Sequence, residues 1–166
     1  LLQKAASVGL DNVDILTAER ARLRMHREAE VQTALDSPDM KTCIDPLTLD
    51  KVLARARGLS LPRWETMLLL EDRLSKLHTQ LPIIKALEAA LAQDTALRSN
   101  KGGQQAGAGV DITEPLSHLY EVANSVAEAG LDAKEQWLPD SKGAELAAEV
   151  SRRIHEAEEA AKRAAA

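Results

Sequence analysis

The chain has 166 residues, of which 45% are hydrophobic and 28% are charged, and its formal net charge is −5. This composition excludes an intrinsically disordered chain, and the length allows one ordinary domain with a core of its own. The acidic balance argues against nucleic acid and anionic membranes as partners, because both attract basic proteins.

Cysteine content and hydropathy indicate where in the cell the protein is expected. A single cysteine, Cys43, excludes an intrachain disulfide and is typical of a reducing compartment. No apolar run approaches the roughly 20 residues of a membrane-spanning helix, and the first residues do not form a signal-peptide pattern. We therefore expect a cytoplasmic or cytoskeletal protein. The chain starts with Leu1 and ends in a helical pattern, so we also expect a piece of a longer polypeptide.

The residue types favour an all-α fold with no β-sheet. Ala, Leu, Glu, Lys, Arg and Gln are strong helix formers and dominate the chain, whereas Phe is absent. Hydrophobic periodicity predicts helices over 12–35, 46–57, 62–80, 82–93, 114–129, 132–138 and 141–164. We predict stacked antiparallel helical hairpins, arranged as an irregular α-solenoid or a bundle. Residues 1–94 form the first hairpins, 95–113 a flexible insert rich in Gly, Gln and Ala, and 114–166 a further hairpin.

Capping residues delimit the first helices. Asp11 begins a capping-box pattern before the helix over 12–35, whose apolar residues are spread so broadly that two packing partners are expected. Asp45 and Pro46 start the next helix as its N-cap and first helical residue. Gly58 is expected to end that helix in the left-handed conformation.

The helix over 62–80 has the clearest pattern in the chain. Its apolar residues recur at three- and four-residue spacing and form one stripe, made of Trp64, Met67, Leu70, Leu74, Leu77 and Leu81. This stripe predicts a neighbouring helix along its length. Pro82 is expected either to kink this helix or to end it, so that a new helix starts over 82–93.

The segment 101–110, KGGQQAGAGV, is the first place to look for a phosphate-binding loop. A P-loop has Gly-Lys-Ser/Thr at its end, so that the lysine and backbone N–H groups reach phosphate oxygens. Here Lys101 precedes the glycines, and no predicted strand leads into the segment. We therefore predict a flexible insert that is mobile over about 98–110 and whose deletion leaves the helices intact.

Three Gly-Leu pairs suggest an internal repeat. Gly9, Gly58 and Gly130 each stand between the end of one helical pattern and the start of the next. The intervals are 49 and 72 residues, and the longer interval contains the insert. The pattern therefore predicts degenerate helical hairpins of about 50 residues, with equivalent packing after each glycine.

The titratable residues form no recognisable catalytic or metal-binding motif. The pairs His26/Glu30 and His155/Glu159 supply two ligands each, where a zinc site needs three or four. Cys43 shares no motif with a histidine and is expected to be an ordinary half-buried thiol. We predict no catalytic residue, no metal site and no cofactor, and therefore neither an enzyme nor a binder of small-molecule substrates.

Two basic islands interrupt the acidic chain, RARLRMHR over 20–27 and RARGLSLPR over 55–63. Nucleic-acid binding needs a basic surplus and stacking aromatic residues, whereas this chain is acidic and has almost no aromatic residues. Arg55 and Arg57 in the second island are instead candidate partner-binding residues.

The second island also resembles the IQ motif, which recruits calmodulin-like light chains. Val52, Arg57 and Gly58 match the motif, whereas Leu53 replaces its Gln. Pro62 replaces its final basic residue and would end the helix that the motif requires.

Trp64 and Trp137 are candidate contact residues for a protein partner, because Trp is enriched at the energetic centres of interfaces. A single Trp on a helical stripe also packs between helices, so a core position is the alternative for both.

The Gly-Leu junctions between Leu- and Ala-rich helices, together with the Gly/Gln/Ala insert, resemble helical-repeat segments of very large scaffold proteins of motile cilia, especially of the axonemal central apparatus. The resemblance covers most of the chain and implies a cytoskeletal scaffold that docks other subunits of a large assembly. We therefore predict a non-catalytic scaffold or protein-interaction segment of a larger, axonemal protein. The alternative is a regulatory adaptor module that binds a calmodulin-like light chain or a partner helix.

Overall fold

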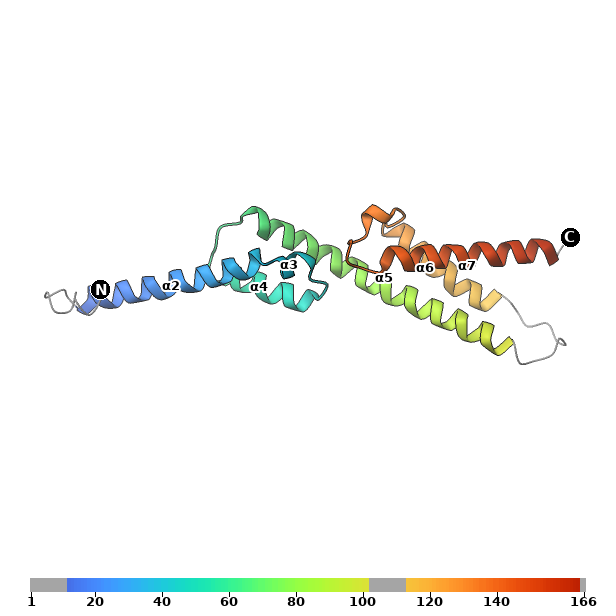
Figure 1. Cartoon of the computed structure of the whole chain (residues 1–166), viewed down its shortest axis with the longest axis horizontal. Coiled ribbons are helices and arrows are strands. Elements are labelled where there is room, and N and C mark those ends of the chain that lie inside the picture. Colours follow the sequence, from blue (N-terminus) through green and yellow to red (C-terminus); the bar gives the residue numbers. More distant parts are fainter. Residues whose placement is uncertain (1–11, 102–112, 165–166) are drawn as a thin grey trace. The chain divides into compact units, whose positions relative to one another are not determined.

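Within residues 12–101 and 113–164, which the computed structural model describes, every regular element is helical (Figure 1). The helices are α2 (Asn12–Asp36), α3 (Pro38–Thr42), α4 (Pro46–Gly58), α5 (Glu65–Lys101), α6 (Thr113–Glu128), the 3-10 helix η1 (Lys134–Gln136) and α7 (Gly143–Ala164). No strand occurs in these two ranges, and the all-α fold is confirmed.

The chain divides into two compact units between Leu74 and Ser75. Helix α5 contributes its residues up to Leu74 to unit 1 and the others to unit 2. The buried apolar residues of unit 1 include Leu35, Leu49, Leu53, Ala56, Met67, Leu70 and Leu74. Those of unit 2 include Leu87, Ala90, Leu91, Leu119, Val126, Leu131, Trp137 and Val150.

In unit 1, helix α4 begins with the N-cap that the sequence predicts. The Asp45 carboxylate accepts hydrogen bonds from the backbone N–H of Leu47 at 3.1 Å and from the hydroxyl of Thr48 at 2.5 Å. The bond from Leu47 satisfies one of the backbone N–H donors that a helix start leaves open. Both bonds hold the pKa of Asp45 below its usual value, and the Thr48 bond is the larger cause.

The end of α4 differs from the sequence prediction. Gly58 is still helical, and the left-handed residue is Ser60, with φ of 55°. The N–H of Ser60 bonds to Arg57 and that of Leu61 to Ala56, which is the Schellman pattern.

The same pattern ends α6, but in a different register. Gly130 has φ of 66°, and the N–H groups of Gly130 and Leu131 bond to Ala127 and Val126. Gly130 therefore corresponds to Ser60 and not to Gly58, so the two Gly-Leu pairs are not equivalent. Gly9 lies outside the described residues.

Helix α5 is continuous from Glu65 to Lys101, where the sequence predicts two helices separated by Pro82. Pro82 lies inside it, and buried residues occur on both sides, among them Leu77 and Leu87. The helix also extends into the predicted insert. The remainder of that insert, residues 102–112, lies outside the described residues, as does its predicted mobility.

In unit 2, α6 and α7 pack side by side, and a turn connects them. The sequence predicts a helix over 132–138 here, but only Lys134–Gln136 form a single 3-10 turn. Gln80 of α5 fixes this turn. Its side-chain amide donates to the carbonyl of Gln136 at 2.9 Å and accepts from the N–H of Leu138 at 3.0 Å.

Candidate protein-interaction surface

The two basic islands, which are far apart in the sequence, meet in unit 1 because α2 and α4 pack as an antiparallel pair. A hollow of about 560 Å³ lies between α2 and the turn that ends α4. It is lined by Arg20, Leu23, Arg24, Arg27, Gly58, Leu59 and Ser60. A second hollow of about 380 Å³ shares Arg27, Gly58 and Leu59 with the first. It adds Glu30, Val31, Ala34, Val52 and Arg55.

We call these two joined hollows the α2–α4 groove. Its floor consists of aliphatic side chains, which include the half-buried Val31, Val52 and Leu59. Four arginines and one glutamate belong to its lining, so the groove is basic although the whole chain is acidic.

The arginines differ in whether they have acidic partners. Arg24 pairs with Glu28 along α2 at 2.7 Å. Among the described residues, no ion pair involves Arg20, Arg27 or Arg55, and all three are exposed. Their charge is therefore directed to solvent.

Arg57, the other predicted contact residue of the second island, is already paired. Arg57 and Arg63 both bond to the carboxylate of Glu71 on α5, the former at 3.0 Å. The bond from Arg57 is the leading cause of the lowered pKa of Glu71. Of the two predicted arginines, the structure therefore places Arg55 in the groove and assigns Arg57 to a contact within unit 1.

The face of α2 that contacts α4 continues beyond the end of α4. With about 100° per residue, Val13, Leu16 and Leu23 lie on the same side of α2 as Arg27. The side chains of Val13, Leu16 and Leu23 are 68%, 53% and 52% exposed. Only Leu35 is buried in the part of α2 whose side chains are described, and the elements that chiefly contact α2 are α4 and the short helix α3 that follows it.

The two tryptophans have different environments. Trp137 is 5% exposed, and its indole N–H donates to the carbonyl of Leu131 at 2.9 Å, so the structure places it in the core of unit 2 and not at a contact surface. Trp64 is half-buried, and its buried indole N–H has no acceptor among the described residues.

The segment that resembles the IQ motif is helical only as far as Gly58. Its Leu53 is fully buried with Leu49 and Ala56 in unit 1. A light chain that surrounds this helix would first have to separate it from unit 1, which would expose these three side chains. In the folded chain, only the outer surfaces of α2 and α4 are open to solvent, and the side of α4 that carries Leu53 is not.

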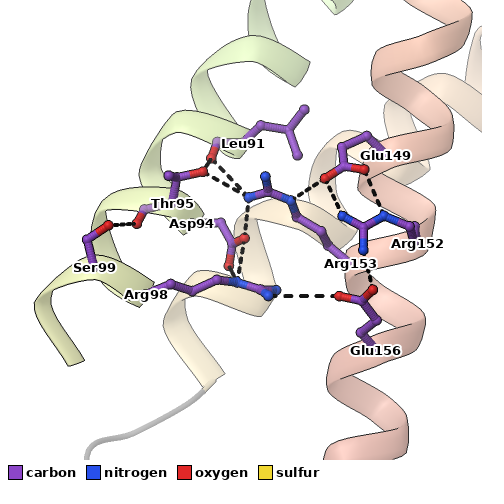
Figure 2. Close-up of polar contacts among 9 residues, drawn as sticks. All are labelled: Leu91, Asp94, Thr95, Arg98, Ser99, Glu149, Arg152, Arg153 and Glu156. Carbon is purple, nitrogen blue, oxygen red and sulfur yellow. Dashed lines mark hydrogen bonds and ion pairs between the residues drawn. The ribbon is translucent and has the colours of Figure 1, made fainter. Parts of the chain in front are cut away.

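Unit 2 contains a network of charged residues between α5 and α7 (Figure 2). Arg153 of α7 reaches α5 and contacts the carboxylate of Asp94 at 2.6 Å and the hydroxyl of Thr95 at 3.0 Å. Arg98 pairs with Asp94 at 2.9 Å. Asp94 is 6% exposed, and two guanidinium groups offset the cost of burying its charge.

The α7 side of this network is held by Glu149, which contacts Arg152 and Arg153, each at 2.7 Å. Hydrogen bonds from these two arginines, that from Arg152 first, lower the pKa of Glu149 to about 2. A carboxylate with this pKa stays ionised at neutral pH and is a poor proton donor, since efficient acids have a pKa near the working pH. The network is therefore suited to holding α5 and α7 together and is poorly suited to acid–base catalysis.

A hollow of about 420 Å³ lies beside Trp137 in unit 2. Core residues such as Leu87, Val126 and Val150 form much of its lining, and its charged residues are Asp132, Lys134 and Glu145. These three are exposed, so they stand at its solvent side and not around an enclosed reaction centre.

The remaining candidates have ordinary contacts. His26 pairs with Glu30 at 3.2 Å and His118 with Glu121 at 3.8 Å. Cys43 is half-buried, and its thiol donates to the carbonyl of Asp45. The described part of the chain contains no group of three His, Cys, Asp or Glu residues arranged to bind a metal, and no helix there is long and apolar enough to span a membrane.

The two basic islands form one groove, which the sequence patterns of the separate islands do not predict. The available signal was the spacing of Arg20, Arg24 and Arg27, which places these residues on one face of a helix together with Leu16 and Leu23. The helix that would meet this face, α4, cannot be identified from that spacing.

No protein-family model, curated protein sequence or solved structure matches this chain.

Proposed function

We propose that the chain is a non-catalytic scaffold and protein-interaction segment of a larger protein. The observation that supports this proposal is the exposed face of α2, where Val13, Leu16 and Leu23 continue the surface that α4 covers further along the helix. Aliphatic side chains at helical spacing are the usual contacts of a helix with a neighbouring helix. The partner in this proposal is another protein.

A matched pair of substitutions tests the proposal. Leu23 and Met25 are 52% and 61% exposed and point to opposite sides of α2. Tagged wild-type, Leu23→Glu and Met25→Glu chains are purified from cells of the source organism, and bound proteins are quantified by mass spectrometry. Leu23→Glu should lose specific partners that Met25→Glu retains. If both variants retain the same proteins as the wild type, this face of α2 is not the interaction surface.

The expected location in the cytoskeleton, and in the axoneme in particular, belongs to the same proposal and rests on the resemblance to ciliary scaffold proteins. Fluorescent tagging of the full-length protein tests it. A signal along the axoneme that survives detergent extraction of the membrane is the expected result, and a diffuse signal lost on extraction would contradict it.

A further inference from the structure

The α2–α4 groove combines an aliphatic floor with arginines that lack acidic partners. Arg20, Arg27 and Arg55 are exposed and unpaired among the described residues, and Glu30 at the edge of the groove pairs with His26. Exposed arginines beside an apolar surface favour an occupant that presents aliphatic and acidic side chains together. Aliphatic side chains alone would fit the floor of the groove in many proteins, and the positive charges of the arginines select those that also carry carboxylates.

The shape of the site indicates a helix. Helix α4 runs antiparallel to α2 and ends at Gly58, opposite Arg24 and Arg27. Figure 1 shows α4 beside only the C-terminal part of α2. Beyond that point, Val13, Leu16, Arg20 and Leu23 continue the same face of α2. A second helix placed there would extend the line of α4.

We propose that the α2–α4 groove and the adjoining face of α2 bind an acidic amphipathic helix of a partner protein. Its apolar stripe lies on Val13, Leu16 and Leu23, and its flanking carboxylates contact Arg20, Arg27 and Arg55. The stretch from Val13 to Arg27 is about 21 Å long at 1.5 Å per residue, which corresponds to roughly four turns of the partner. This inference rests on the proposed function and adds the chemistry of the partner.

Other possible occupants of the α2–α4 groove match its arginines or its aliphatic floor less well. The first eleven residues of this chain contain one Lys and one Asp, so they carry no net charge to match the arginines. Nucleic acid would use the arginines but would leave the aliphatic floor without a partner, since base-stacking surfaces are aromatic. A second copy of the chain is acidic overall, and the experiment below separates it from a different protein.

The test uses the full chain labelled with ¹⁵N and a synthetic helical peptide of about 18 residues, with leucines at three- and four-residue spacing and glutamates beside them. A second peptide has lysines in place of the glutamates. The acidic peptide should shift the amide resonances of residues 13–27 and 58–60, and the lysine peptide should bind at least about tenfold more weakly.

Two charge reversals on the same helix give the matched control. Arg27→Glu places a carboxylate in the centre of the groove and should weaken the acidic peptide about tenfold, because attraction becomes repulsion. Arg22→Glu makes the same change on an exposed residue roughly 140° away around α2, and should alter binding by less than about twofold. Circular dichroism of both variants verifies that the helices are retained.

Four results would overturn the inference. The first is that the lysine peptide binds as tightly as the acidic peptide, and the second is that the two charge reversals have equal effects. The third is that a duplex oligonucleotide binds and the acidic peptide does not. The fourth is that the acidic peptide does not bind and the chain associates with itself in a way that Arg27→Glu abolishes. If the acidic peptide fails but Leu23→Glu still loses native partners that Met25→Glu retains, the inference is wrong and the proposed function stands.

Discussion

At the scale of single residues, the position of Trp137 depends on the absence of a side chain at residue 143. A Cβ atom added to Gly143 would overlap the six-membered ring of Trp137, at Cε3 and Cζ3. The ring therefore lies directly against the start of α7. The sequence shows a glycine near a predicted helix start, but this contact depends on how the turn before α7 folds, so it could not be predicted.

Gly143→Ala should destabilise unit 2 by about 1–3 kcal/mol, the usual cost of inserting a methyl group into a packed site. The matched control is Gly58→Ala. Gly58 is the last residue of α4, and a Cβ there has no neighbouring atom within 4 Å. Since alanine favours helix over glycine, Gly58→Ala should be neutral or stabilising by up to about 1 kcal/mol. Urea unfolding measures both, and equal effects would contradict the packing described for Trp137.

The charged network of unit 2 makes a prediction about pH. The pKa of Glu149 is lowered from 4.5 to about 2, so its ion pairs with Arg152 and Arg153 stabilise the folded chain fully above pH 4.5. This contribution is lost as the pH falls from 4.5 towards 2, because the unfolded chain takes up the proton first. The thermal midpoint of Glu149→Gln should therefore fall less than that of the wild type over this interval. Parallel pH profiles would contradict the assigned contacts.

At the scale of elements, α5 shows how packing overrides a local signal. Pro82 lacks the N–H that would bond to the carbonyl of His78, and an interior proline costs a helix about 3 kcal/mol. Burial of an aliphatic side chain recovers about 1.5–3 kcal/mol, and Leu77 and Leu87 are both buried near the proline. The sequence predicted two helices because the cost of Pro82 is local and visible, whereas the compensating contacts come from distant segments.

In the segment 132–138, packing prevents a helix that the local sequence favours. Asp132 and Glu135 have the spacing of a capping box, which predicts a helix. However, Trp137 and Leu138 are buried, and the backbone bonds to Gln80 instead of continuing the helical pattern. Gln80 lies beside the predicted stripe of this helix, and nothing in the sequence indicated that it would bind a backbone segment 56 residues away.

Gln80→Ala should destabilise unit 2 by about 1–3 kcal/mol, because it leaves the buried N–H of Leu138 without its acceptor. Gln93→Ala removes the same side chain from an exposed position of the same helix and should change the free energy of unfolding by less than about 0.5 kcal/mol. Equal changes, measured by urea unfolding, would show that the bonds to Gln136 and Leu138 do not hold the turn.

At the scale of the whole molecule, burial is unevenly distributed. The first half of α2 has no buried side chain among those described, whereas α5 contains several and α7 contains Val150. Segments with few buried contacts open locally at low free-energy cost. Composition and periodicity were enough to predict an all-α chain. They did not reveal that the first half of α2 has no buried side chain among the described residues, since this depends on where α4 ends.

Limited trypsin digestion of the isolated chain tests this distribution. Cuts after Arg20, Arg22, Arg24 or Arg27 should precede cuts after Lys85 or Arg153, because Lys85 and Arg153 belong to packed helices of unit 2. Mass spectrometry of early digests locates the cuts. Early cleavage at Lys85 or Arg153, with the first half of α2 intact, would contradict the uneven stability described here.

The central claim is that the exposed face of α2 is an interaction surface in the native assembly. Site-specific photocrosslinking tests it most directly, with a benzophenone amino acid at position 16 on that face or at position 22, about 120° away around the helix. The full-length protein carrying either residue is irradiated in its native extract. Adducts to another protein should form from position 16 and be much weaker from position 22. Equal adducts from both positions, or none from position 16, would contradict the claim.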